Sequence, residues 1–120
     1  MRIESQPDSP LRIETKKMGD AVVLRLSGHI DELGADTLST AVDKIMEGGD
    51  LRIVVDLTEV MFMSSTGLGQ IMRTYRTVRA GDGYVRIVNP QPLIADLFTI
   101  TKLNKLLDIY PTLEDALRDV

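Results

Sequence analysis

Residues 51–81 read LRIVVDLTEVMFMSSTGLGQIMRTYRTVRAG, and the pattern of this segment indicates the fold class. Residues 51–57 form a short, nearly continuous apolar run rich in β-branched side chains, which is typical of a central parallel strand covered on both faces. A loop is expected over 58–64. The next apolar residues fall on one face of a helix that begins near Ser65 and ends at Gly81, namely Leu68, Ile71, Met72, Tyr75 and Val78.

The flanking segments continue this alternation of strands and helices. Residues 11–15 and 21–27 predict the two strands of a hairpin, with a turn at 17–20. Further strands are predicted at 84–88 and 106–109, and further helices around 38–46, 93–98 and 112–120, the last with a capping box at Thr112 and with Val120 pointing inward. Such alternation implies parallel βαβ units with right-handed crossovers. We therefore expect an α/β fold, with a mixed, mostly parallel sheet of four or five strands and about four helices.

Length and composition narrow the possible functions. The 120 residues fit one domain, expected over residues 11–120 after a flexible polar lead-in at 1–10. A net charge of −4 argues against binding nucleic acid. The chain has no cysteine and a lone histidine, His29, so neither a metal centre nor a cofactor is expected. No signal peptide or membrane-spanning run is evident, and the cytoplasm is the expected compartment.

Three consecutive hydroxyl residues, Ser64, Ser65 and Thr66, stand where the central strand leads into its helix. The first amides of a helix have no partner inside it and carry partial positive charge, so a hydroxyl or a phosphate is stabilised there. Gly67 and Gly69 leave the first turn without bulky side chains, which lets a protein or a phosphate approach the backbone. A serine or threonine before a helix is also the usual N-cap, so the spacing alone does not identify a phosphorylation site.

The segment 56–69 resembles the signature of STAS domains in bacterial anti-sigma-factor antagonists, Asp-Leu-x-x-Val-x-Phe-Met-Asp-Ser-[Ser/Thr]-Gly-Leu-Gly. The matching residues are Asp56, Leu57, Val60, Phe62, Met63, Ser65, Thr66, Gly67, Leu68 and Gly69. The resemblance covers residues 11–120 and includes the segments 26–31, 85–88 and 109–116. It implies the STAS fold and a phosphoacceptor at Ser65.

The same resemblance implies a protein that is a substrate and a ligand and not an enzyme. The unphosphorylated form would bind an anti-sigma factor that is also a serine kinase and so free the sigma factor. Phosphorylation would end that binding, and a PP2C-type phosphatase would reset the protein. Ser64 departs from the signature, because an aspartate usually precedes the phosphoacceptor. This departure leaves Ser64 and Thr66 as alternative phosphoacceptors.

The expected partner-binding residues flank this run, and they are His29, Asp31, Met63, Ser64, Thr66 and Gly67. The resemblance places the first two in a loop near the phosphoacceptor, although Asp31 is equally a helix cap. Of the apolar residues before the helix, Phe62 is expected to be buried and Met63 to be partly exposed at the contact surface.

Two other functions fit parts of the sequence. One is a STAS accessory subunit of a lipid-transport ATPase, or of another signalling complex, that works without phosphorylation. The other is a serine-nucleophile enzyme, since a serine at a strand-to-helix turn is a feature of such enzymes. The chain lacks the G-x-S-x-G pattern, and His29 would have to act as the base alone. The regulatory antagonist is therefore the preferred hypothesis.

Overall fold

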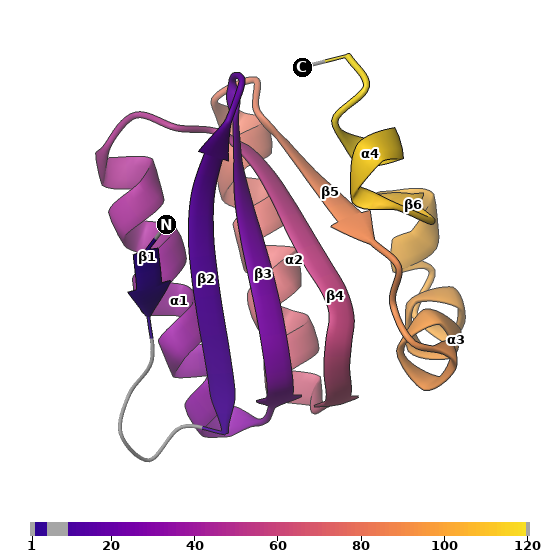
Figure 1. The fold of residues 1–120 in the computed structure, drawn as a ribbon. Coiled ribbons are helices and arrows are strands. Elements are labelled where there is room, and N and C mark those ends of the chain that lie inside the picture. Colours follow the sequence, from indigo (N-terminus) through magenta and orange to yellow (C-terminus); the bar gives the residue numbers. More distant parts are fainter. Residues whose placement is uncertain (1, 5–9, 120) are drawn as a thin grey trace.

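The computed structural model describes residues 2–4 and 10–119, which form a six-stranded sheet flanked by helices (Figure 1). The strands lie side by side in chain order as β1 (Arg2–Glu4), β2 (Leu11–Met18), β3 (Ala21–Ile30), β4 (Arg52–Met63), β5 (Tyr84–Val88) and β6 (Asp108–Tyr110). The helices are α1 (Glu32–Glu47), α2 (Ser65–Ala80), α3 (Pro92–Ile100), the 3-10 helix η1 (Leu103–Lys105) and α4 (Leu113–Ala116). Strands β1 to β3 pair antiparallel, and β3 to β6 pair parallel. The α/β class and the mixed sheet are confirmed.

Helices α1 and α2 lie on one face of the sheet (Figure 1), because each connects two parallel neighbours with the same handedness. The main core lies between these helices and the sheet and also includes Ile94 and Phe98 of α3; Phe98 is its largest fully buried side chain. A smaller apolar cluster on the opposite face packs beneath α4 and contains Ala21, Val23, Val54, Val88 and Ala116. The carboxyl ends of β3 and β4 lie together and lead directly into the first turns of α1 and α2.

Strand β4 is longer than the sequence predicts, because residues 58–63 are strand and not loop. They pair in parallel with the end of β3, which itself continues to Ile30 opposite Met63. The register shifts twice, between Arg25 and Ser27 and between Gly28 and His29, and each shift places an extra residue on β4. Such β-bulges bend a strand and redirect its side chains.

Other departures from the expected elements lie near the chain ends. Residues 2–4, expected within the lead-in, pair with β2 and raise the sheet to six strands in the described part of the chain. Three residues are too few to show an apolar period. Strand β6 lies at 108–110 and not at 106–109, because η1 comes first and turns Leu107 into the core. Helix α4 ends at Ala116, and the expected inward position of Val120 lies outside the described residues, as do residues 1 and 5–9.

Candidate functional site

Ser64 is the N-cap of α2 and ties this helix to the end of β3. Its Oγ accepts a hydrogen bond from the amide of Gly67 at 3.1 Å and donates to the carbonyl of Ile30 at 3.2 Å. The Ser64 amide donates to the same carbonyl at 2.9 Å. Its hydroxyl therefore satisfies one of the free amides of the helix start and links α2 to the sheet.

Ser65 and Thr66 follow in the first turn of α2, and both are exposed. Neither hydroxyl forms a hydrogen bond to another described residue. The first turn contains no acidic residue, so the partial positive charge of the helix start is not neutralised from within the turn. The three consecutive hydroxyls thus differ in structure, with one used as a cap and two facing solvent.

Gly67 is buried, which corrects the expectation that it lies on the partner-binding surface. A Cβ at this position would lie 2.6 Å from the carbonyl oxygen and 2.7 Å from Cγ2 of Ile30. The glycine is therefore needed for α2 to approach β3 closely. Gly69, in contrast, is exposed and has nothing within 4 Å of such a Cβ, so the open backbone of this turn lies there.

Asp31 is the N-cap of α1, in the neighbouring strand-to-helix connection. One of its carboxylate oxygens accepts from the amide of Gly34 at 2.8 Å. A Cβ on Gly34 would lie 2.5 Å from the carbonyl oxygen of His29, so α1 also packs tightly against the end of β3. Of the two alternatives for Asp31, the capping role is confirmed, and the side chain is half-buried.

Met63 is buried and Phe62 is exposed, which reverses the sequence-based expectation for these two residues. Met63 is 7% exposed within the main core, whereas Phe62 is 50% exposed. The reason is the position of the cap. Because Ser64 caps α2, Met63 is the residue before the cap, the position at which an apolar side chain packs inward as a hydrophobic staple, and Leu68 packs against the same core. Met63 therefore supports the turn from inside and presents little surface to a partner.

His29, at the end of β3, is exposed and lies beside Phe62 of β4. The two rings meet edge to face, with centroids 6.1 Å apart and planes at 69°. Met61 is also exposed, at 61%. His29 is thus a strand residue and not a loop residue. It lies at the carboxyl end of β3, beside the end of β4 that leads into α2. The exposure of Met61 and Phe62 could not be predicted from the apolar pattern of the sequence, because it depends on the register shift between β3 and β4.

The residues whose pKa values are shifted lie in a different region, near α4, and they are Tyr84, Arg86 and Asp119. Arg86 forms two hydrogen bonds with the carboxylate of Asp119, at 2.6 and 3.0 Å, and also donates to the carbonyl of Ala116. This pairing lowers the pKa of Asp119 and raises the pKa of Arg86. Burial raises the pKa of Tyr84, whose ring lies 4.0 Å from the Arg86 guanidinium. These contacts anchor the C-terminal part of the chain to β5.

Within residues 2–4 and 10–119, no three histidine or acidic side chains are grouped so that they could hold a metal ion. The same described part contains no helix with the length and apolarity needed to cross a bilayer. At the carboxyl ends of β3 and β4, the hydroxyls of Ser65 and Thr66 are exposed at the start of α2, and the apolar side chains of Met61 and Phe62 are exposed at the end of β4.

This chain is similar in sequence to one family of known proteins over most of its length. The sequence profile of the STAS domain matches residues 12–116. An anti-sigma-B factor antagonist from Bacillus subtilis is 31% identical over 100 residues, which are 82% of this chain and 90% of that protein. An anti-sigma F factor antagonist from Paenibacillus polymyxa is 27% identical over 111 residues, or 92% of this chain and 95% of that protein.

Solved structures agree with these sequence matches. An anti-sigma factor antagonist from Mycobacterium paratuberculosis has a TM-score of 0.83 at 31% identity, with 97% of each chain covered. The Bacillus protein SpoIIAA matches in its unphosphorylated form with a TM-score of 0.71 at 21% identity, over 90% of this chain and 99% of that one. Its phosphorylated form gives 0.72 at 22% identity, over 88% and 96%. At these identities, the similarity to SpoIIAA shows that the two proteins share a fold.

Proposed function

The chain belongs to the STAS-domain family, and we propose that it is an anti-sigma-factor antagonist switched by phosphorylation of Ser65. In the unphosphorylated form it binds an anti-sigma factor that is also a serine kinase, and the sigma factor is released in the cytoplasm. Phosphorylation ends this binding, and a PP2C-type phosphatase restores it. The protein itself is the substrate and not the enzyme.

The observation that supports this proposal is the position of Ser65 just after the N-cap of α2. The hydroxyl is exposed, so a kinase can reach it without unfolding the helix. The cap hydrogen bond is made by Ser64, so a phosphate on Ser65 leaves it in place. The free amides and positive end of the helix also stabilise a phosphate on this turn.

The three hydroxyls differ in their surroundings. Ser64 is half-buried, and its hydroxyl both donates and accepts hydrogen bonds that hold α2 against β3. A phosphate on Ser64 would displace these bonds. Thr66 is also exposed and is the remaining alternative. Ser65 is preferred because it matches the phosphoacceptor position of the family signature.

Phosphorylation would act through charge. A phosphate adds about −1.5 to −2 charge and three acceptor oxygens at one point of the surface. If the interface buries Ser65 in its unphosphorylated form, binding of the phosphorylated form would require removing water from this charge. That cost weakens binding. The solved forms of SpoIIAA, a relative in fold, show that a phosphorylated and an unphosphorylated protein can share this architecture.

The test is to incubate the full chain with ATP and its cognate anti-sigma-factor kinase and to locate the phosphate by mass spectrometry. We expect one phosphate on Ser65, its loss in Ser65→Ala, and a weaker complex for the phosphorylated chain. Phosphate on Thr66 in the wild type would reassign the acceptor. The proposal fails if neither complex nor phosphate is observed with any cognate kinase. Copurification with an ATPase subunit that is unaffected by Ser65→Ala would instead support the accessory-subunit function.

A further inference from the structure

Three large apolar side chains are exposed at the end of β4 and near the start of α3. Met61 and Phe62 lie at the end of β4 and are 61% and 50% exposed, and Leu93 near the start of α3 is 81% exposed. Single exposed apolar residues are ordinary on a protein surface. A group of them with a polar rim, however, is typical of a protein–protein contact.

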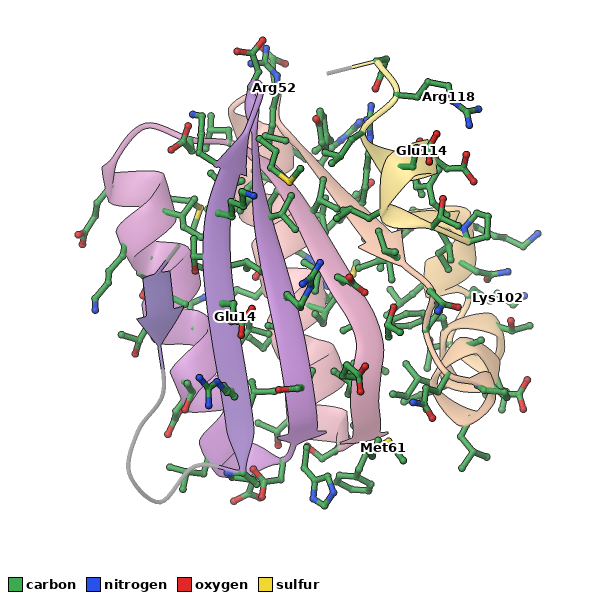
Figure 2. The ribbon with its side chains drawn as sticks, in the orientation of Figure 1. Glu14, Arg52, Met61, Lys102, Glu114 and Arg118 are labelled. Atoms are coloured by element: carbon green, nitrogen blue, oxygen red, sulfur yellow. The ribbon has the colours of Figure 1, made fainter. Side chains whose placement is uncertain are left out.

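Gln91 holds the two segments that carry these side chains together. Its Nε2 donates to the carbonyl of Thr58 at 3.0 Å and lies 3.4 Å from the sulfur of Met61. Gln91 occupies the N-cap position of α3, but its side chain does not cap that helix. Leu93 follows two residues later, so this contact brings the start of α3 next to Met61. Figure 2 shows Met61 near the end of β4, on the side of this strand where α3 lies.

The second bulge of β4 explains why two consecutive side chains face solvent. Successive residues of a regular strand point to opposite faces, so one of Met61 and Phe62 would be expected to point into the core. The register passes from Gly28–Val60 to His29–Phe62, which leaves Met61 without a partner residue on β3. Bulges are common beside functional sites, where they redirect side chains. The bulge here enlarges the exposed apolar surface.

We propose that Met61, Phe62 and Leu93 form the apolar centre of the surface that binds the anti-sigma factor, with Ser65 and Thr66 on its polar rim. This inference rests on the proposed function and specifies its partner surface, which extends to α3. Only Met63 and Ser64 separate Phe62 from Ser65 in the chain, so the apolar group and the switch lie at the same strand-to-helix connection. The complementary region of the partner is an apolar patch, since methionine and aromatic side chains are enriched at the centres of interfaces.

The test compares Leu93→Ser with the matched control Ile100→Ser in the full chain. Ile100 is 76% exposed on the same helix, about 10 Å farther along its axis. Isothermal titration with the purified cognate anti-sigma factor should show that Leu93→Ser weakens binding about tenfold or more, as for loss of an interface anchor, while Ile100→Ser stays within about twofold. Urea unfolding should show both variants to be as stable as the wild type.

Two outcomes would overturn this inference while leaving the proposed function intact. One is wild-type affinity in Leu93→Ser, and the other is an equal loss in Leu93→Ser and Ile100→Ser. Failure of the wild-type chain to bind any cognate anti-sigma factor would instead contradict the proposed function. Phe62→Ser provides a second measurement within the same apolar group, and its affinity should fall together with that of Leu93→Ser.

Discussion

Replacing Gly67 with alanine tests the close approach of α2 to β3 on which the candidate site depends. The new Cβ would lie 2.6 Å from the backbone oxygen of Ile30, so the helix start must shift. Overpacking of this kind costs about 1–3 kcal/mol. Alanine also favours a helix over glycine by about 1 kcal/mol, which hides part of that cost.

Gly69→Ala isolates the packing contribution, because Gly69 lies in the same helix with open space around it. The gain in helix propensity is about the same in both variants and cancels in the comparison. We therefore expect Gly69→Ala to raise the free energy of unfolding by about 0.5–1 kcal/mol. Gly67→Ala should be less stable than Gly69→Ala by about 1–3 kcal/mol.

Urea unfolding followed by circular dichroism at equal protein concentration would measure this difference. The free energies should be compared only if both variants have the m-value of the wild type. Equal stability of Gly67→Ala and Gly69→Ala would refute the close contact between α2 and Ile30. Binding of the anti-sigma factor by Gly69→Ala would show in addition whether the open side of the first turn is covered in the complex.

Three further predictions address the cap, the core and the C-terminal anchor. Ser64→Ala should lower the free energy of unfolding by about 1 kcal/mol through loss of the N-cap, measured by thermal or urea unfolding. Phe98→Ala should cost about 3–5 kcal/mol in the same assay, because Phe98 is 0% exposed in the main core. The anchor of α4 should weaken in acid, because pairing with Arg86 lowers the pKa of Asp119. Its contribution is complete above the usual aspartate pKa of about 4 and is lost as the pH falls through the lowered folded value. Amide exchange of α4 against pH should show this loss in the wild type and not in Asp119→Asn.

The sequence predicts the fold well wherever an apolar period is long enough to distinguish a strand from a helix. The residues of α2 show this, since one periodic face and a glycine at 81 place the helix within a residue of its observed bounds. The hairpin of β2 and β3 is equally clear from two alternating segments and a turn. A strand of three residues such as β1 gives no such period, and its pairing with β2 depends on contacts between distant residues.

The candidate site is predicted less completely, because its surface depends on register. The family signature locates the hydroxyl run, but it does not show which hydroxyl serves as the cap. Ser64 is the cap because its Oγ accepts from the amide of Gly67, and the same hydroxyl also donates to the carbonyl of Ile30, 34 residues earlier in the chain. The exposure of Met61 and Phe62 follows from a bulge between two parallel strands, and the burial of Met63 from the position of the cap. Each of these features is set by tertiary pairing and not by local composition.

The same contacts explain why a phosphate would change the surface of this protein and not its fold. The carbonyl of Ile30 accepts hydrogen bonds from both the amide and the hydroxyl of Ser64, and Gly67 packs against the same residue. The first turn of α2 is therefore fixed to the end of β3 on both sides of Ser65. A phosphate on this turn leaves these contacts in place, so a bound partner would meet new charge on an unchanged backbone. Because Thr66 lies in the same fixed turn, this reasoning holds for either exposed hydroxyl.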